Sequence, residues 1–249
     1  MITGDYHTHT IYSHGKGTIL ENAQEAKKIG LKQLAITDHS FSHSFVAVKR
    51  DKLDEMREKI NEAEKITGLK IYLGIEANFV STNGDVDVNE DDLAKLDILL
   101  VGFHRFVKSS LKDKFLFFLP NMIFGKKSSK SLKKRNTETL IKALEKYPID
   151  ILVHPTYKMH FDIKKVAKKL KETNTLIELN TTKLCLTQKA VKILIDEGVN
   201  FIINSDAHIP ANVGKVQPAI DFAEKFNIPK ERIVNLNKTP IFKKFKKTN

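Results

Sequence analysis

The sequence is poor in several features that mark particular classes of protein. Among its 249 residues there is one cysteine, Cys185, so no disulfide can form within the chain and a disulfide-stapled domain is excluded. No apolar run is long enough to span a membrane, and the first residues, MITGDYHTHT, lack the basic flank and apolar stretch of a signal peptide. We therefore expect a cytoplasmic protein without a membrane partner.

Glycine-rich phosphate-binding loops are also missing. The chain has 11 glycines, yet neither a GxGxxG nor a GxxxxGK[ST] motif follows any apolar run with strand character. This absence argues against a dinucleotide-binding enzyme and against a P-loop nucleotide hydrolase, because both classes hold their phosphates in such loops.

Positive charge, by contrast, is abundant. The net charge is +12, supplied mostly by lysine, and much of it lies between Lys108 and Arg135 and in the C-terminal segment IFKKFKKTN. Such an excess favours anionic partners, including nucleic acid and phosphorylated metabolites. A lysine-rich solvated surface gives the same composition, so charge alone does not identify a partner.

Short apolar runs with strand character alternate with amphipathic helical stretches along the chain. The predicted strands lie at about 2–6, 33–37, 70–76, 97–102, 149–153, 175–180 and 200–204. The predicted helices lie at about 18–30, 50–67, 137–147, 162–173, 187–198 and 215–226. This alternation predicts an α/β fold with a parallel sheet covered by helices, either an open doubly wound sheet or a closed barrel. Seven strands suit a barrel, and we expect residues 1–249 to form one domain.

One connection is much longer than a single helix requires. It covers about residues 106–136, and its middle, KDKFLFFLPNMIFGKKSSKSLKKRN, joins an apolar aromatic cluster to a basic run. Long connections in compact domains are usually lids, binding loops or disordered segments. We expect a lid over the barrel mouth rather than a membrane-surface or partner-docking element. An extra helix packed on the barrel is the structural alternative.

Side chains that can bind metals follow nearly every predicted strand at its end. In parallel α/β barrels the carboxyl ends of the strands share one face, which carries the active site, so residues far apart in sequence would meet in one cleft. These residues are Asp5, His7 and His9 after the first strand, Asp38 and His39 after the second, Glu76 on the third, His104 after the fourth, His154 after the fifth, and Asp206 and His208 after the seventh.

Imidazole and carboxylate donors together suit zinc, manganese or iron. His7 and His9 are two residues apart, as are Asp206 and His208, so in extended backbone both side chains of each pair point the same way. Seven of the nine histidines belong to this set when His14, in the loop after the first strand, is included. Because one zinc ion uses about four ligands, we expect two or three divalent ions.

Six short motifs occur along almost the whole chain. They are DYHTHT at 5–10, ITDHS at 36–40, GIEAN at 74–78, GFHR at 102–105, HP at 154–155 and NSDAH at 204–208. In this order they resemble the motifs of the PHP (polymerase and histidinol phosphatase) family. Through YSHGKGT at 12–18 and ITDHS the chain is most similar to the family's small stand-alone trinuclear-zinc phosphatases. The resemblance implies a distorted (β/α)7 TIM-like barrel with its metal site at the C-terminal ends of the strands.

The resemblance also implies a ligand set for each metal position. The ligands are His7, His9, Asp206 and Glu76 for a first ion, Glu76 with His104 and His154 for a second, and His14, His39 and His208 for a third. In some relatives an aspartate occupies the loop of His14. If His14 does not bind, two ions would suffice.

The predicted reaction is hydrolysis of a phosphomonoester. Only Glu76 and Asp206 among the expected ligands carry negative charge, so three divalent ions would leave the cleft cationic and attract a small anionic phosphorylated substrate. A metal pair would lower the pKa of a bridging water, and the resulting hydroxide would attack phosphorus in line.

Two residues are expected to act on the substrate beside the metals. Arg105, directly after His104, would clamp the phosphate, and with the ligand Asp206 it forms the predicted catalytic pair. Asn180, at the end of the sixth strand, is a further candidate contact with the substrate. Both Arg105 and Asn180 also have ordinary interpretations, as a surface charge and as a turn former.

Four other polar residues near the cluster have candidate supporting roles. Asp5 and Asp38 flank ligand histidines and would accept hydrogen bonds that fix the imidazole tautomers, with strand-end solvation or helix capping as the alternative. His43 and His160 lie in loops near the mouth. Either would serve as general acid, although a solvated loop histidine is the simpler interpretation of both.

Other functions remain open at this point. The same metals would serve a phosphodiesterase or nuclease acting on nucleic acid or nucleotides, although the basic run KKSSKSLKKR at 126–135 lacks aromatic residues for base stacking. A histidinol phosphatase is a further alternative. An amidohydrolase is disfavoured because the fourth strand is followed by Gly102–Arg105 without a bridging lysine. A non-catalytic scaffold is disfavoured because the ligand set is complete.

Overall fold

The computed structural model describes residues 1–125 and 128–245. Within this part of the chain, seven strands form one sheet in which each strand pairs in parallel with the next strand of the sequence. The strands are β1 (Gly4–Asp5), β2 (Gln33–Ile36), β3 (Lys70–Asn78), β4 (Ile98–Gly102), β5 (Ile151–Leu152), β6 (Leu176–Asn180) and β7 (Phe201–Asn204).

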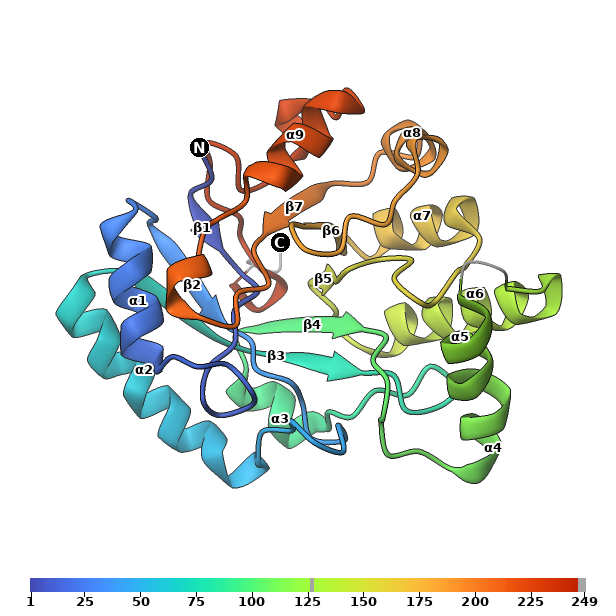
Figure 1. Cartoon of the computed structure of the whole chain (residues 1–249), viewed down its shortest axis with the longest axis horizontal. Coiled ribbons are helices and arrows are strands. Elements are labelled where there is room, and N and C mark those ends of the chain that lie inside the picture. Colours follow the sequence, from blue (N-terminus) through green and yellow to red (C-terminus); the bar gives the residue numbers. More distant parts are fainter. Residues whose placement is uncertain (126–127, 246–249) are drawn as a thin grey trace.

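The sheet curves until its first and last strands meet. The backbone N–H of Tyr6 donates to Asn204 Oδ1 (3.0 Å), and that of His9 donates to the carbonyl of Ala207 (2.8 Å). A parallel bridge also joins Thr8 to Ala207. Figure 1 shows the strands at the centre and the larger helices around them. The prediction of a distorted (β/α)7 barrel is confirmed.

Helices connect the strands and cover the outside of the barrel. They are α1 (Ile19–Lys28), α2 (Leu53–Thr67), α3 (Glu90–Lys95), α4 (Leu111–Asp113), α5 (Leu119–Phe124), α6 (Lys130–Lys146), α7 (Ile163–Glu172), α8 (Gln188–Asp196) and α9 (Gln217–Lys225). Short 3-10 turns are η1 (Arg50–Lys52), η4 (Pro210–Asn212), η5 (Lys230–Arg232) and η6 (Lys243–Phe245). The six predicted helices are present, whereas α3 was not predicted and α6 begins at 130 instead of 137. No helix in the described ranges has the length and apolarity needed to cross a bilayer.

The barrel interior is apolar at one end. Alternate residues of a strand face opposite sides, so Ile98 and Leu100 of β4 face the interior while Leu99 and Val101 belong to the outer cluster that includes the helix residues. Phe242, from the C-terminal segment, packs edge-on against Tyr6 and Tyr72 of this interior cluster, with ring centroids 5.0 Å and 5.4 Å away.

The interior becomes polar toward the carboxyl ends of the strands. On β3, Glu76 and Asn78 share the face of Tyr72, and on β6 Glu178 and Asn180 share one face. All four polar residues are buried. The barrel therefore has an apolar floor and a polar upper layer, and the upper layer positions the site described below.

The long connection after β4 folds as helices packed on the barrel. A π-helical turn, η2 (Lys114–Phe118), joins α4 to α5. The Phe117 and Phe118 rings are buried against Phe103, with ring centroids 5.5 Å and 5.8 Å away. Figure 1 places α4 and α5 beyond the arrowheads of β3 and β4, near the mouth of the barrel. Residues 126–127 of the basic run, and residues 246–249 of the basic tail, lie outside the described residues.

Candidate metal centre

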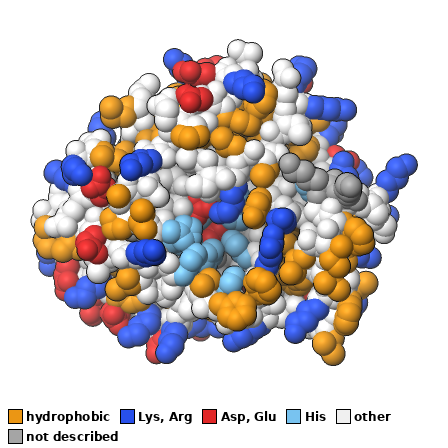
Figure 2. Space-filling model, in the orientation of Figure 1, with side chains coloured by type: hydrophobic (Ala, Val, Ile, Leu, Met, Phe, Trp, Pro, Cys, Tyr) orange, Lys and Arg blue, Asp and Glu red, His pale blue; other side chains and the backbone are white. Residues whose placement is uncertain are grey.

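The nine predicted metal ligands gather at the carboxyl ends of the strands. Figure 2 shows histidine side chains clustered in a hollow on this face of the molecule. The segment after β1 supplies His7, His9 and His14, the segments after β2, β4 and β5 supply His39, His104 and His154, β3 supplies Glu76, and the segment after β7 supplies Asp206 and His208.

Glu76 lies at the centre of this cluster and is 1% exposed. Its Oε1 lies 2.7 Å from His154 Nε2 and 2.9 Å from His104 Nε2. Its Oε2 lies 2.8 Å from His39 Nδ1 and 3.6 Å from His9 Nε2. One buried carboxylate thus stands between two groups of imidazoles, which is the position that a metal-bridging ligand requires.

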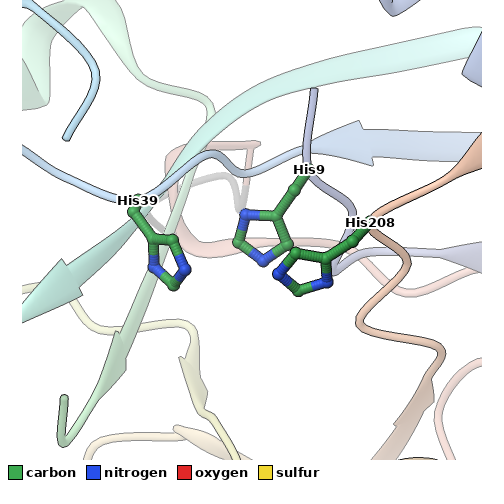
Figure 3. A group of neighbouring side chains, drawn as sticks. All are labelled: His9, His39 and His208. Atoms are coloured by element: carbon green, nitrogen blue, oxygen red, sulfur yellow. The ribbon is translucent and has the colours of Figure 1, made fainter. Parts of the chain in front are cut away.

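His9, His39 and His208 come from three different segments and lie side by side (Figure 3). One ring nitrogen of each lies within 4.8 Å of those of the other two, so the three are close enough to share a metal ion. The His14 ring lies beside them, with its centroid 4.3 Å from that of His208 and 4.8 Å from that of His39. Two further groups of this kind are His7, His9 and Glu76, and His39, Glu76 and His104.

Asp206 approaches the cluster from the β7 side. Its Oδ1 lies 3.3 Å from His9 Nε2 and 3.5 Å from His7 Nε2. Asp206 and His154 both have positive φ, 57° and 31°. Residues other than glycine adopt this conformation at an energetic cost, and such strain concentrates at functional sites. The fold therefore holds two predicted ligands in backbone conformations that local structure alone does not favour.

The donor atoms of the cluster fit a metal centre. Within the described residues, several buried donor atoms make no hydrogen bond, and these are His7 Nε2, His9 Nδ1 and Nε2, His39 Nδ1, Glu76 Oε2, His104 Nδ1 and His154 Nδ1. The close approach of Glu76 Oε2 to His39 Nδ1 is thus not a hydrogen bond. An unpaired buried polar atom costs about 1–3 kcal/mol. Coordination would satisfy those atoms that face the cluster, so the donor set fits divalent ions.

The protonation of two of these rings also favours metal binding. Burial, with His39 nearby, lowers the pKa of His9 well below its usual value. Burial, together with His39 and His208, lowers the pKa of His14 to about 4. Both rings are therefore neutral at pH 7, which is the form that binds a metal ion.

Glu178, in β6, was not among the predicted site residues, yet it contacts the cluster. Its Oε1 lies 2.7 Å from His7 Nδ1 and accepts a hydrogen bond from Asn204 Nδ2 (3.0 Å). Its Oε2 accepts from the His154 backbone N–H (2.7 Å) and from Asn180 Nδ2 (3.0 Å). A carboxylate on Nδ1 fixes the ring so that Nε2 faces the other ligands. An acidic residue inside the apolar strand LIELN was the signal that sequence reasoning missed.

Lys183, in the segment after β6, was also not predicted. Its ammonium pairs with Asp206 Oδ2 and lies 5.9 Å from the centroid of the Tyr157 ring. Burial alone would lower the pKa of Lys183, but Asp206 and Glu76 outweigh burial and raise it, so the side chain is charged. Lys183 therefore brings a positive charge to the Asp206 side of the cluster.

Asp5 and Asp38 are buried, and their hydrogen bonds hold the segments that carry the predicted ligands. Asp5 accepts from the backbone N–H groups of Ser205 (3.1 Å) and Gly214 (2.9 Å). Asp38 accepts from the backbone N–H of Thr10 (2.7 Å) and from the Thr10 hydroxyl (2.6 Å). Among the described residues these carboxylates thus bind backbone and hydroxyl groups, and both support the loops around the cluster.

Asn180 is 1% exposed and uses both ends of its amide inside the protein. Its Nδ2 donates to Glu178 Oε2 (3.0 Å) and to Asp206 Oδ2 (3.1 Å). Its Oδ1 accepts from the backbone N–H groups of Thr182 and Lys183, both at 3.0 Å. These contacts place Asn180 between two carboxylates of the site, where it also orders the turn that carries Lys183.

The remaining predicted residues lie at the edge of the site. Arg105 is exposed directly after His104. The His43 ring lies 5.5 Å from that of His39 and 6.4 Å from that of His104, measured between centroids. Burial, with these two rings, lowers the pKa of His43 to about 4, so it is neutral at pH 7. The carbonyl of His160 accepts a hydrogen bond from Asn136 Nδ2 (2.8 Å), which ties its loop to α6.

Comparison with known sequences gives consistent matches. A family model described as PHP domain matches residues 5–182. A probable phosphatase of Caldanaerobacter subterraneus subsp. tengcongensis is 30% identical over 246 residues, covering 93% of this chain and 86% of that protein. A probable phosphatase of Proteus mirabilis is 30% identical over 252 residues, covering 94% and 90% of the two chains.

A solved structure agrees with the barrel described above. The histidinol phosphate phosphatase of Lactococcus lactis subsp. lactis, complexed with zinc, L-histidinol and phosphate, superposes with a TM-score of 0.61 and covers 96% of each chain. The sequence identity is 12%. At this identity the similarity shows the shared fold.

Proposed function

The chain belongs to the PHP domain family and is a hydrolase, and from this premise we propose that it releases phosphate from small anionic phosphomonoesters with two or three divalent ions. The observation that carries the proposal is the position of Glu76. This one buried carboxylate lies within 3.6 Å of a nitrogen of five imidazoles, those of His7, His9, His39, His104 and His154. A carboxylate shared between two ions needs imidazole ligands of both ions around it, and His7, His9, His104 and His154 are placed to serve in this way.

The nine predicted ligands divide into three sets in this proposal. His7, His9, Asp206 and Glu76 would hold one ion, Glu76 with His104 and His154 a second, and His14, His39 and His208 a third. Zinc suits this donor set, and manganese or iron would also accept it. When bound, such ions supply positive charge for the phosphate oxygens and an activated water at neutral pH.

The chain's own residues would orient the substrate. Lys183 lies on the Asp206 side of the cluster, and Arg105 is exposed on the β4 side. Positive charges on two sides of the mouth attract a phosphate dianion and set its orientation. Glu178 would keep the His7 tautomer that turns Nε2 toward the ligands, and burial of Glu76 excludes water from the centre of the cluster.

Elemental analysis of the purified protein, paired with hydrolysis of p-nitrophenyl phosphate, tests the proposed function. We expect two to three equivalents of zinc, manganese or iron, loss of activity after chelation, and its return when metal is added. Metal binding without monoesterase activity, but with cleavage of bis(p-nitrophenyl) phosphate, would replace the proposal by a phosphodiesterase. Less than one equivalent, with no uptake on reconstitution, would contradict the metal centre itself.

The chain is, in this proposal, one barrel domain whose inserted segment at 106–136 closes one side of the mouth. The segment is tied to the loop after β5 through Asn136 Nδ2 and the His160 carbonyl, at 2.8 Å. The segment therefore begins directly after β4 and ends at a contact with the loop after β5, and both regions lie beside predicted ligands.

Deletion of residues 112–134 should raise KM for p-nitrophenyl phosphate several-fold without removing the metal ions. The segment would confine the substrate and has no predicted ligand in it, so substrate binding should change more than metal content. Because Phe117 and Phe118 leave with the segment, metal content equal to that of the parent protein serves as the control for folding. Unchanged KM in a fully metal-loaded variant would show that the segment is only packed on the barrel.

A further inference from the structure

Two phenylalanine rings stand exposed at the edge of the metal centre. Phe45 is 76% exposed and Phe106 is 53% exposed. Their ring centroids are 5.5 Å apart at an interplanar angle of 77°, which is a favourable edge-to-face arrangement. We call these two side chains the aromatic pair. Because both rings face solvent, the pair contributes little to the buried core, and its position needs another reason.

The aromatic pair is held in place by the backbone. The segments after β2 and β4 are joined by an antiparallel bridge between His43 and Val107. The Ser44 N–H donates to the carbonyl of Phe106 (2.9 Å), so the loops that carry the two rings are tied to each other. The pair is therefore a fixed feature of the mouth.

Phe106 also has an unfavourable backbone conformation. Its φ is 59°, in the left-handed region. Bulky residues are outliers there, whereas glycine adopts this conformation without steric cost. At this exposed position with strained backbone, phenylalanine stabilises the fold no more than glycine would. Such an outlier next to a site motivates a functional hypothesis.

The aromatic pair lies one imidazole away from the predicted ligands. The centroid of the Phe45 ring is 6.5 Å from that of His43, and the His43 ring is 5.5 Å from that of His39. A phosphate bound at the metal centre would thus have its ester substituent within reach of the pair. Figure 2 shows hydrophobic side chains directly beside the clustered histidines on this face.

We propose that Phe45 and Phe106 form a substrate subsite that binds an aromatic or heteroaromatic group attached to the phosphate. The inference rests on the proposed function and names the substrate class of the same site. Ring faces and edges at fixed positions prefer another planar π-system, which can pack edge-to-face or offset against them. A flexible alkyl substituent would gain only the burial of apolar surface against the aromatic pair. The site is thus selective for aryl and heterocyclic phosphomonoesters.

Substitution of either ring tests the subsite in the metal-loaded protein. Phe106→Gly removes the ring and leaves a residue that prefers the existing φ, so folding is preserved. Phe45→Ser removes the other ring. Each variant should lower kcat/KM for phenyl phosphate about 3- to 10-fold and lower it less for n-propyl phosphate, which loses only area burial. The comparison is made between variant and wild type for each substrate, because the two leaving groups differ in their own reactivity.

Ile66→Ser is the control, since Ile66 is an apolar side chain 63% exposed near the end of α2 and lies outside both the aromatic pair and the inserted segment. It should change neither substrate. Equal losses on both phosphates in Phe106→Gly, or no loss on either, would overturn the subsite.

Binding of phenylphosphonate and propylphosphonate, measured by calorimetry, separates this inference from the proposed function. Neither compound is a phosphate ester, so the measurement does not depend on turnover. If wild type hydrolyses neither ester, the proposed function fails. A preference for the phenyl compound that disappears in Phe106→Gly would still support the subsite, and equal binding of both compounds by wild type would overturn it.

Discussion

Replacing Glu76 by glutamine is expected to lower kcat/KM for p-nitrophenyl phosphate by about 10³-fold and to deplete the purified protein of divalent ions. Glutamine keeps the size of the side chain and removes the charge that would attract two ions. It also places an NH2 group against ring nitrogens, since His154 and His104 lie 2.7 Å and 2.9 Å from Oε1 and His39 lies 2.8 Å from Oε2. Elemental analysis and steady-state kinetics measure both effects.

The charge of Glu76 is the reason for this large effect. Burial alone would raise the pKa of Glu76, but His104, His7 and His39 outweigh burial and hold the pKa well below its usual range, so the group is a carboxylate at neutral pH. Glu138→Gln, on the exposed face of α6, makes the same chemical change away from the site and should leave metal content and activity unchanged. Full metal content and unchanged kcat/KM in Glu76→Gln would remove Glu76 from the site.

The barrel could be predicted because its strands are nearly continuous apolar runs separated by amphipathic helices. The run DILLVG, for example, gives β4 (Ile98–Gly102) almost residue for residue. β5 (Ile151–Leu152) is shorter than the predicted 149–153, although the backbone N–H groups of Asp150 and Val153 still donate to Leu99 and Val101 of β4. Strand ends are where hydrogen-bond criteria and sequence patterns differ most.

The positions of the helices in the inserted segment could not be predicted for a different reason. Its periodicity is interrupted, because the π-helical turn Lys114–Phe118 shifts the apolar positions between α4 and α5. Exposed Phe115 and buried Phe117 therefore stand two residues apart in a helical stretch. A pattern search for one 3.6-residue repeat does not recognise such a segment.

The nine candidate ligands were found from sequence because strand ends converge in a parallel barrel. This rule did not identify Glu178 and Lys183. Glu178 lies inside β6, two residues before the strand ends at Asn180, and reaches the cluster only because it faces the barrel interior. Lys183 is one of many lysines in a basic chain, and nothing local distinguishes it before the fold places it on Asp206. Pairwise contacts of this kind depend on three-dimensional packing.

Replacing Glu178 by glutamine is expected to weaken metal binding by about 10- to 100-fold while leaving the nine candidate ligands in place. The two carboxylate oxygens accept from four donors, His7 Nδ1, Asn204 Nδ2, the His154 N–H and Asn180 Nδ2. Glutamine has one oxygen, so its NH2 would face a pair of donors in either orientation. Competition with a chelator of known affinity measures the loss, and Glu172→Gln, on the exposed face of α7, is the control.

A double-mutant cycle with His7 decides how Glu178 acts. If Glu178 works by holding the His7 ring, the glutamine substitution should cost affinity in the wild-type background and little in a His7→Ala background, because the ring it orients is gone. If Glu178 instead supports the barrel generally, its loss should lower thermal stability of the metal-free protein and weaken metal binding equally in both backgrounds.

Three carboxylates, Glu178, Glu76 and Asp206, approach the His7 ring at 2.7, 3.4 and 3.5 Å. That concentration of negative charge favours a cation at this ring. Glu178 contacts Nδ1, whereas Glu76 and Asp206 approach Nε2, so Glu178 is placed to orient the ring and the first of these two outcomes is expected.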